Sequence, residues 1–551
     1  MGATEVLVVG AGPTGLTMAN VLDRQGVSFR IIDTKGGPVE ETRALVVHAK
    51  TLELLDKLGL ADRAVEKGQR MGAVQVFGQG RPAGKLSFLE DGAGDRTPYP
   101  FALVLEQHRT ERLLIDGLEE TGGRVEWDTE LVSLASTRDG ARATIRRADG
   151  STESIEAGWV VGADGASSPV RHSLGLGFEG DTYEQTLFLA DVEMEWDYGS
   201  RQVSIDMTRA GFYGIFPMPG EKRFRLIGNV PEELEGKDEI SAEDVQGVLD
   251  RRSGLKTRIT GLRWSSIYRT HRRMTERFRV GHVFLVGDAA HIHSPAGGQG
   301  MNTGIGDAYN LGWKLALVAK GLAHESLLDS YEAERMPFAR SILNGTDRAF
   351  ALQVTTDTAT QRLKIFLTPL IFGFVSAIPP IRRRAFWLVS QLWTEYRGSP
   401  AVAWSGSTGK RPQAGDRAPY GFFATGPQAG ESIFDTLCDQ DHHLLLFEGG
   451  RADAALPDPA RKRKDLQALT SAYEASIRLH LVAPGNRSLH GRYEVDSPTL
   501  ILVRPDGHVA YRGPADDPDA LGSYLDGLFL RHERLTHQTS GAQGAERSVG
   551  A

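Results

Sequence analysis

Apolar residues at the start of the chain are spaced to form a strand, a helix and a second strand in close succession. Residues 5–9 are a short β-branched run that ends at Gly10, which is typical of a buried strand. A helical pattern follows to about Arg24, and Gly26 is well placed to end that helix. Residues 29–33 form the next apolar run. This order predicts a βαβ unit and therefore a parallel sheet.

Further along, the pattern changes from helical to alternating and back again. Alternation of apolar and polar residues dominates from about 187 to 268 and predicts a mostly antiparallel sheet, inserted as a separate lobe. Residues 283–286 then form a buried-strand pattern, and residues 304–320 form a strong helical one. A second helical pattern over 327–343 is predicted to break near Pro337.

A separate unit is predicted from about residue 415. Three strand patterns are followed by a turn at Asp506 and Gly507, a fourth strand, and a helix over 520–529. This order resembles a thioredoxin-like domain, but the chain has no Cys-x-x-Cys motif, so we expect no thiol–disulfide role. The last residues, 537–551, are rich in Gly, Ser, Gln and Ala and are predicted to be disordered.

Composition narrows the classes of function open to this chain. Its 551 residues carry a net charge of −8 with both signs mixed, without the basic stripe that a nucleic-acid partner requires. The one cysteine, Cys438, excludes an internal disulfide and a multi-thiolate metal site, and His291 and His293 lack further metal ligands nearby in the sequence. No signal segment is evident and the apolar run 365–378 is too short to span a bilayer, so we expect a cytoplasmic protein without a membrane partner.

The glycine turn after the first strand has the spacing of a dinucleotide-binding site. Gly10, Gly12 and Gly15 form a G-x-G-x-x-G motif between the predicted strand and helix. The first glycine permits a tight turn, the second lets a pyrophosphate approach the backbone, and the third lets helix and strand pack closely. Asp33 ends the second strand, where a carboxylate can hold ribose hydroxyls. These features predict dinucleotide binding without separating FAD from a nicotinamide cofactor.

Two later motifs point to a flavin. Asp164 and Gly165 form an Asp-Gly pair that enters a predicted helix. A predicted strand ends at Gly287 and Asp288, whose carboxylate can accept hydrogen bonds from a ribityl chain. The glycine-rich loop 295–302 follows and leads into a helix. Its backbone N–H groups and the helix N-terminus can stabilise the negative charge of a reduced flavin.

Together the three motifs resemble the single-component flavin aromatic hydroxylases, or group A flavoprotein monooxygenases, which include phenol, pentachlorophenol and polyketide hydroxylases. The motifs carry the resemblance over residues 5–345, and domain order extends it to the C-terminus. It implies an α/β fold: a Rossmann-like FAD-binding domain with an inserted, mostly antiparallel β-sheet substrate domain and a C-terminal thioredoxin-like domain. The predicted bounds are 1–180 for the first part of the FAD-binding domain, 181–275 for the middle domain, 276–400 for the return of the FAD-binding domain with a helical region, 410–536 for the thioredoxin-like domain and 537–551 for the tail.

The resemblance also implies which residues bind the cofactor. The residues expected at the ADP half and the pyrophosphate are Gly10, Gly12, Gly15, Asp33 and Arg43. Those expected near the ribityl chain and the flavin are Gln107, Asp164, Gly287 and Asp288. Those expected to line the isoalloxazine ring are Pro295, Gly298, Gly300, Met301 and Asn302. Asp164 is also implied to lie on the route of the nicotinamide cofactor.

Only one dinucleotide motif is evident, which suits a nicotinamide cofactor, with NADPH favoured over NADH, that binds briefly, reduces FAD and leaves. The family chemistry then adds O2 to reduced FAD, and the resulting C4a-hydroperoxide hydroxylates an aromatic, phenol-like substrate. A phenol reacts better as phenolate, so a nearby base or hydrogen-bond acceptor would help. The candidates for this catalytic role are His48, Tyr213 and Arg225, with ordinary packing as the alternative for each. Phe212 and Phe216, beside Tyr213, are expected to form an apolar pocket wall.

Other functions share this set of motifs. A Baeyer–Villiger oxygenase or a flavin-dependent reductase would have nearly the same sequence, and a flavin-binding redox sensor is the alternative that is not an enzyme. The Trp-x-Trp-x-Ile-Pro motif of flavin-dependent halogenases is absent. A homodimer is expected from the frequency of that state among oligomers. The stretch Tyr-Arg-Gly-Ser-Pro at 396–400 is similar to one in family members that act on phenols and polyketides, but it fixes neither the substrate nor the site of hydroxylation.

Overall fold

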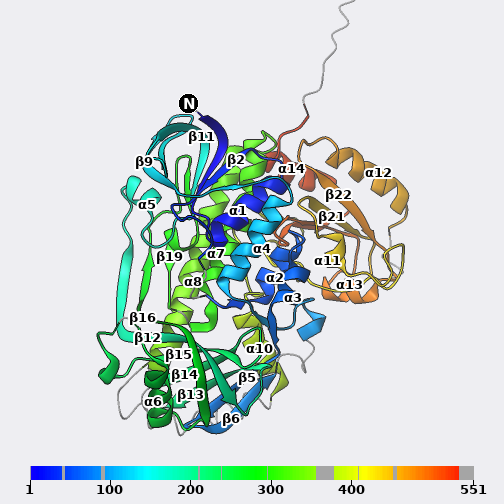
Figure 1. Ribbon diagram of the computed structural model, residues 1–551. Helices are drawn as coiled ribbons and strands as arrows, with labels where there is room; N and C mark the ends of the chain where they lie inside the picture. The colour runs from blue at the N-terminus through cyan, green and yellow to red at the C-terminus, as the bar shows by residue number, and fades with distance from the viewer. Residues whose placement is uncertain are drawn as a thin grey trace, which may run out of the picture.

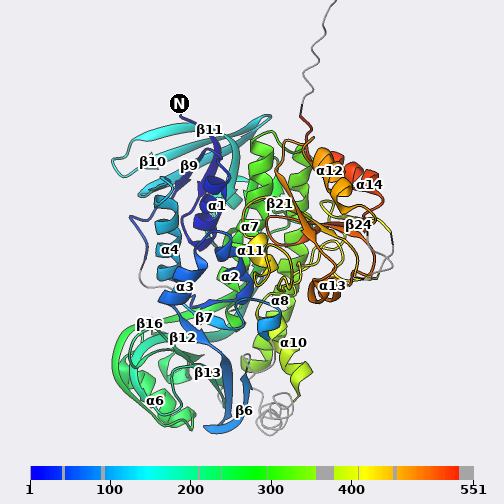
Figure 2. The ribbon, with the colours of Figure 1, turned by 90° about the vertical axis from the view of Figure 1, so that its right-hand side faces the viewer.

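The structure is a computed structural model that describes residues 2–39, 44–87, 93–208, 211–237, 239–294, 296–354, 378–406, 409–450 and 456–532. Figures 1 and 2 show an upper body around helices α1 and α7, a lower lobe built on a sheet, and a C-terminal unit beside the body. Arg43, Pro295, most of the apolar run 365–378 and the predicted tail 537–551 lie outside the described residues.

The first sheet brings together strands from distant parts of the sequence. Its parallel core consists of β1 (Gly2–Val9), β2 (Phe29–Ile32), β11 (Thr152–Gly162) and β18 (Val283–Leu285). The strands β8 (Val125–Glu126), β17 (Arg279–Val280), β9 (Thr129–Thr137) and β10 (Gly140–Arg147) complete it. Val9 pairs with Gly162, and Gly162 pairs with Leu285, so the carboxyl ends of β1, β11 and β18 lie side by side. Each of the three sequence motifs therefore starts from the same edge of this sheet.

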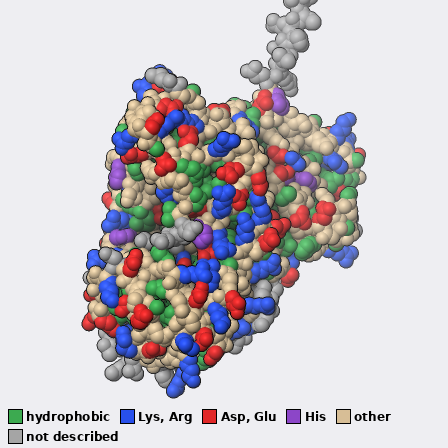
Figure 3. All heavy atoms as spheres, in the orientation of Figure 1, with side chains coloured by type: hydrophobic (Ala, Val, Ile, Leu, Met, Phe, Trp, Pro, Cys, Tyr) green, Lys and Arg blue, Asp and Glu red, His purple; other side chains and the backbone are tan. Residues whose placement is uncertain are grey.

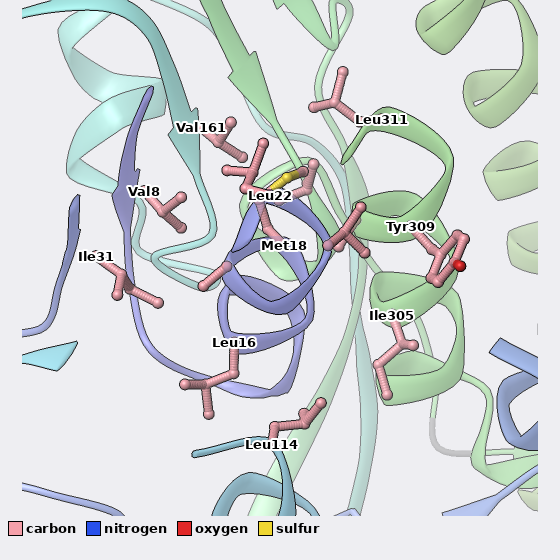
Figure 4. Packing of buried hydrophobic residues seen from close by; sticks show 14 of the residues in the cluster. Val8, Leu16, Met18, Leu22, Ile31, Leu114, Val161, Ile305, Tyr309 and Leu311 are labelled. Carbon is pink, nitrogen blue, oxygen red and sulfur yellow. The ribbon is translucent and has the colours of Figure 1, made fainter. Parts of the chain in front are cut away.

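Helices cover this sheet and bury its apolar strands. Figure 4 shows α1 (Pro13–Arg24) between the sheet and α7 (Gly300–Ala319), with Met18 and Leu22 among the enclosed side chains. The two helices approach closely, because a Cβ on Gly312 would lie 2.8 Å from a methyl carbon of Val21. Helix α4 (Gln107–Glu119) packs on α1 as well, and Leu114 contributes to the same core. This packing holds the N-termini of α1 and α7 close to the edge where the motifs begin.

The lower lobe is an eight-stranded, mostly antiparallel sheet, as predicted. In sheet order its strands are β19 (His291–Ile292), β16 (Thr257–Met274), β12 (Glu179–Trp196), β15 (Arg223–Asn229), β14 (Gly211–Pro217), β13 (Gln202–Thr208), β5 (Ala73–Gly78) and β6 (Arg81–Ser87). The prediction placed 73–87 in the first domain, whereas these residues form β5 and β6 of the second sheet, and β5 pairs with β13 in parallel. Helix α6 (Ala242–Arg252) covers one face of this sheet.

Short elements join the body to the lobe. Strands β3 (Val46–Val47), β7 (Ala102–Val104) and β4 (Gln69–Met71) form a small sheet, and helices α2 (Ala49–Asp56) and α3 (Ala61–Lys67) lie between β3 and β4 in the chain. Helix α5 (Pro169–Ser173) follows β11 and contacts β9 of the first sheet. Helix α8 (Asp329–Val354) runs through Pro337, so the predicted break at this proline was wrong. Glu334 and Arg335, in the turn before the proline, are held by buried ion pairs, and this tertiary packing overrides the local preference. Helix α10 (Pro379–Val389) follows later in the chain.

The C-terminal unit has the predicted thioredoxin-like order of elements. Its five-stranded sheet runs β20 (Ala403–Trp404), β24 (Val509–Pro514), β23 (Thr499–Val503), β21 (His442–Phe447) and β22 (Ile477–Val482). Its helices are α11 (Ile433–Thr436), α12 (Pro459–Thr470), α13 (Arg487–Arg492) and α14 (Pro518–Leu528). Trp313 and Leu317 of α7 belong to one of its apolar clusters, so the unit packs directly on that helix. Over the described residues, no helix has the length and apolar character needed to cross a membrane.

Candidate functional site

The first glycine turn has the close contacts that its sequence predicts. Gly10 has a φ of 102°, and a Cβ there would lie 2.4 Å from the carbonyl oxygen of Ala163. A Cβ on Gly15 would lie 1.8 Å from the carbonyl oxygen of Gly10, so only glycine lets α1 pack on this turn. Gly12 differs, because a Cβ there would meet no atom of the structure within 4 Å. No described side chain caps the N–H groups at this end of α1, which leaves them free for an anion.

The carboxylate of Asp33 is held over the same turn. Its Oδ2 accepts a hydrogen bond from the backbone N–H of Ala11 at 2.7 Å, and its Oδ1 accepts one from that of Lys35 at 2.9 Å. A carboxylate oxygen has two acceptor positions, so both oxygens can still accept a ribose hydroxyl. The placement of Asp33 therefore fits the ribose role expected of it.

A second carboxylate lies near Asp33, and the sequence analysis missed it. Glu111 is buried on α4, and its Oε1 accepts a hydrogen bond at 2.8 Å from Nε2 of Gln107, the predicted flavin contact. Its Oε2 is buried without a hydrogen-bond partner among the described residues. Burial raises the pKa of Glu111, and the negative charge of Asp33 adds to this shift. The spacing of four residues between Gln107 and Glu111 on one helix was the signal that could have revealed the pair.

The three motifs meet in space around Thr14. A Cβ on Gly287, which has a φ of 58°, would lie 2.7 Å from Oγ1 of Thr14. A Cβ on Gly304 of α7 would lie 2.3 Å from the same oxygen and 3.3 Å from the Cα of Gly287. A Cβ on Gly10 would lie 2.9 Å from the Cα of Asp164. The dinucleotide turn, the Asp-Gly pair and the Gly-Asp turn thus form one continuous site.

Asp164 and Asp288 are placed differently within it. The carboxylate of Asp164 accepts hydrogen bonds from Oγ of Ser168 at 2.5 Å and from the backbone N–H of Val170 at 2.9 Å, so it shapes its own loop beside the dinucleotide turn. Asp288 is exposed on the turn after β18. The protein packed around its carboxyl group displaces water and raises its pKa, and the negative charge of Asp307 adds to this shift. An accessible carboxylate at this point suits the predicted contact with a ribityl chain.

The second glycine-rich loop is fastened to the start of α2. The side chain of Asn302 donates to the carbonyl oxygens of Val46 and Gly298, both at 2.8 Å. It accepts from the backbone N–H of His48 at 2.8 Å and from Oγ1 of Thr51 at 2.7 Å. Since its amide is fully used within the protein, Asn302 can contact a ring only through its backbone. Neighbouring positions are more open: Gly297 is exposed, and Gly298, Gly300 and Met301 are half-buried.

His48 supports the same loop from below. Its Nε2 lies 2.9 Å from the carbonyl oxygen of Gly297. A carbonyl only accepts, so the proton is assigned to Nε2 of the imidazole. Burial lowers the pKa of His48 to about 4, so the ring is neutral near pH 7. Its placement fits a residue that positions the loop.

Tyr213 and Arg225 lie on opposite faces of the lower sheet. Tyr213 packs in the core beneath α6, and its Oη has no partner among the described residues. Burial raises the pKa of Tyr213 to about 12, so neither its surroundings nor its ionisation supports a role as a base. Arg225 faces the other way and holds Asp191 in a bidentate ion pair of 2.6 and 2.8 Å. A guanidinium cannot serve as a base, so Arg225 can act on a substrate only as a hydrogen-bond donor or as a positive charge.

The face of the sheet opposite α6 carries an apolar surface. Phe212 packs there with Leu187, Met207, Ile227 and Tyr268. A neighbouring cluster contains Phe216, and it links the sheet to the half-buried Val46 beside the glycine-rich loop. We call these two clusters the apolar wall; the remaining members of the second cluster are Leu45, Met71, Val74, Ala102, Val104, Val203, Ile205 and Met218. The two phenylalanines predicted to line a pocket thus share one face, and Tyr213 between them points away.

Polar and charged groups surround the junction between the body and the lobe. Figure 3 shows Lys, Arg and His side chains gathered on this face at the level where the lower lobe meets the body. Among the described residues no group of three or more His, Cys, Asp or Glu is placed to hold a metal ion. His291 instead bonds to Asp307 at 2.7 Å, and Nδ1 of His293 lies 3.0 Å from the carbonyl oxygen of Ser294.

Comparison with known proteins agrees with this geometry. A model of the FAD-binding domain family matches residues 3–346, and a model of the aromatic-ring hydroxylase C-terminal domain matches residues 411–531. The chain is 34% identical over 536 residues to 6-methylpretetramide 4-monooxygenase of Streptomyces rimosus, covering 96% of this chain and 94% of that protein. It is 32% identical over 545 residues to pentachlorophenol 4-monooxygenase of Sphingobium chlorophenolicum, covering 96% and 97%.

A solved structure shares the whole architecture. The flavin-dependent monooxygenase PieE, in complex with FAD and substrate, superposes with a TM-score of 0.80 at 22% identity, over 95% of this chain and 98% of that one. This match concerns the fold alone. Since both family models match and the two relatives align over nearly their full length, the chain belongs to the FAD-dependent aromatic-ring hydroxylases, and the resemblance seen in its motifs is confirmed.

Proposed function

We propose that this chain hydroxylates an aromatic, phenol-like or polycyclic polyketide-like substrate, with FAD as cofactor, NAD(P)H as reductant and O2 as co-substrate. The observation that carries the proposal is the meeting of the three FAD motifs next to an apolar wall. The relatives named above, a pentachlorophenol and a methylpretetramide monooxygenase, support the substrate class.

The described residues fit FAD at four points. The uncapped N-terminus of α1 and the open space over Gly12 suit a pyrophosphate. Asp33 suits the adenosine ribose, and the exposed carboxylate of Asp288 suits the ribityl chain. The backbone of 297–301, at the N-terminus of α7, suits the ring. Arg43 and Pro295 keep the roles that the family implies, as predictions.

Bound FAD, once reduced, supplies the activation of O2, and the chain supplies position and surroundings. The N–H groups at the start of α7 would stabilise negative charge on the reduced ring. The apolar wall, with Phe212 and Phe216, would hold the substrate ring and keep water out. Arg225, paired with Asp191 on the face that carries the wall, would attract a phenolate rather than remove its proton. We propose no base among the described residues.

The reductant and the oligomeric state complete the proposal. The Lys, Arg and His side chains at the junction of body and lobe suit the phosphates of a nicotinamide dinucleotide, and we favour NADPH. A homodimer remains the expected oligomer.

The proposal is tested with purified protein reconstituted with FAD. NADPH oxidation in air is measured with and without simple phenols and polycyclic phenols, and the product is analysed by mass spectrometry and NMR. We expect stimulated oxidation and a product with one new hydroxyl group on a ring. A ring-expanded ester would favour a Baeyer–Villiger oxygenase, and NADPH oxidation that never adds oxygen to any compound would favour a reductase. Absence of both activities would leave the redox sensor as the better account.

A further inference from the structure

A buried polar network connects the turn after β18 with the C-terminal unit. It starts at Asp307 of α7, which is fully buried. Its Oδ2 accepts from the backbone N–H of Gly287 at 3.1 Å and from Nε2 of His291 at 2.7 Å. Its Oδ1 accepts from Nε of Arg335 at 2.6 Å. Asp307 therefore holds the turn on which Asp288 lies, through the backbone N–H of Gly287.

Arg335 of α8 extends the network away from the FAD site. Its Nη1 donates to Oη of Tyr396 at 3.0 Å, and its Nη2 donates to the carbonyl oxygen of Thr303 at 3.1 Å. All three nitrogens of the guanidinium are thus occupied, by Asp307, Tyr396 and the backbone of α7. Such a fork fixes the positions of its partners in a way that a flexible lysine would not.

The preceding residue, Glu334, connects the same helix to the C-terminal unit. Its carboxylate accepts from Nη1 and Nη2 of Arg504 at 2.6 and 2.9 Å and from Nζ of Lys314 at 2.7 Å. Burial alone would raise the pKa of this carboxyl, but the charges of Arg504 and Lys314 lower it to about 2. Arg504 also pairs with Asp506 in the turn between β23 and β24. Two buried cations and two buried anions therefore meet where the C-terminal unit touches the body.

The Tyr-Arg-Gly-Ser-Pro stretch at 396–400 forms hydrogen bonds with both Glu334 and Arg335 of α8. Tyr396 holds Arg335, and Oγ of Ser399 donates to Oε1 of Glu334 at 2.7 Å. The ring of Tyr396 also packs against that of His508, with centroids 4.4 Å apart. The stretch 396–400 thus connects the part of the network around Arg335 with the part around Glu334.

A small cavity lies at the centre of this junction. Its lining includes Thr51 and Asn302 from the flavin side and Tyr396 and His508 from the C-terminal side, and it leaves about 20 Å³ for the centre of a water molecule. Nε2 of His508 is buried without a hydrogen-bond partner among the described residues. One ordered water fits this space and would satisfy the imidazole.

We propose that Asp307, Glu334, Arg335 and Tyr396 are positioning residues for the cofactor: they hold the Gly287–Asp288 turn in its FAD-binding form and make that form depend on the docked C-terminal unit. This inference rests on the assignment of Asp288 to FAD. Buried ion pairs add little net stability, but separating their partners is strongly destabilising because a buried charge is left uncompensated, so the pairs oppose any rearrangement of the turn. The C-terminal unit, which lacks redox cysteines, thereby gains a function in holding FAD.

The test compares Tyr396→Phe with Tyr493→Phe in the full-length protein. Both tyrosines are buried and each takes part in one hydrogen bond through Oη, but Tyr493 donates to the carbonyl oxygen of Pro419 inside the C-terminal unit, outside the network. FAD is removed, and its dissociation constant is measured by flavin fluorescence together with the melting temperature of the FAD-free protein. We expect Tyr396→Phe to raise the dissociation constant about tenfold, because a buried guanidinium loses a partner. Tyr493→Phe should change it less than twofold.

Two further variants keep the test decisive. Ser399→Ala, which also removes a single hydroxyl group, should raise the dissociation constant at least threefold, and it replaces Tyr396→Phe if that variant does not fold. Asp288→Ala separates the two levels of the inference: if it leaves FAD binding unchanged, the assignment of Asp288 fails. If Asp288→Ala weakens FAD binding while both Tyr396→Phe and Ser399→Ala bind FAD as tightly as the control, the positioning role is overturned and the assignment survives.

Discussion

Replacement of Gly12 by alanine separates the FAD-binding role of the glycine turn from its structural role. A Cβ at this position meets no atom of the structure within 4 Å, and the backbone there, with φ −78° and ψ −178°, is one that alanine adopts. Gly12 is the N-cap residue of α1 and makes no side-chain hydrogen bond. Alanine is a poorer N-cap residue than glycine, which lowers the free energy of unfolding, but it also restricts the unfolded chain, which raises it. These two effects oppose each other, and we expect the free energy of unfolding to change by less than about 1 kcal/mol.

The effect on FAD should be much larger. The added methyl group would occupy the space through which a pyrophosphate reaches the N–H groups of α1. Loss of one hydrogen bond to a charged group costs about 1.5–3 kcal/mol, so the dissociation constant for FAD should rise by about 10- to 150-fold. Gly15→Ala should behave differently, because its Cβ would lie 1.8 Å from the carbonyl oxygen of Gly10 and must push the helix off the strand. We expect it to reduce the stability of the fold itself, by about 3 kcal/mol.

The assay is urea unfolding of the FAD-free proteins, followed by FAD titration of those that fold. Gly527→Ala is the matched control, since this glycine lies on α14 of the C-terminal unit, and a Cβ added there would meet no atom within 4 Å. This variant should leave FAD affinity unchanged, and it should change stability only through the higher helix propensity of alanine. FAD binding by Gly12→Ala as tight as that of the wild type would refute the placement of the pyrophosphate.

Individual side chains give three further predictions. The pKa of Glu334 is lowered to about 2, so the stability that its charge provides is present above its unfolded pKa of about 4.5 and lost as pH falls through 2; of a total of about 3 kcal/mol, unfolding curves at pH 7, 5 and 3 should show a loss of about 2 kcal/mol by pH 3, and a flat profile would contradict it. Tyr213→Phe removes a hydroxyl group without a described partner, so stability should not fall and the rate of hydroxylation should stay within threefold; a hundredfold loss of rate would restore Tyr213 as a catalytic residue. The pKa of His48 is lowered to about 4, so kcat/KM measured from pH 5.5 to 9 should show the same ionisations in the wild type and in His48→Asn, and the disappearance of one in the variant would argue against a neutral His48.

Short stretches of adjacent residues were enough to predict the FAD-binding domain. The strand at Gly2–Val9, the turn at Gly10 and the helix at Pro13–Arg24 are adjacent in sequence, and each is marked by a residue type that the geometry requires. The Gly-Asp turn at 287–288 was found for the same reason. Because parallel strands place their carboxyl ends at one edge, their meeting in space could be expected as well.

Non-local pairing was not predictable in the same way. The strands β5 and β6 join the second sheet across more than a hundred residues, and their alternation alone does not say which sheet they enter. The faces of Tyr213 and Arg225 depend on which side of that sheet α6 covers. The network around Glu334 depends on charges from α7, α8 and the C-terminal turn, none of which marks its partner in the sequence. Pro337 was misjudged because these buried contacts outweigh its local preference.

The most direct test of the central claim is an experimental structure of the chain with FAD bound. The account predicts one FAD per chain, with the pyrophosphate over Gly12, the ribityl chain beside Asp288, and the ring against residues 297–301, its reactive edge turned towards the wall that contains Phe212 and Phe216. A bound FAD whose ring lies away from that wall, or whose pyrophosphate lies elsewhere than at the N-terminus of α1, would contradict it.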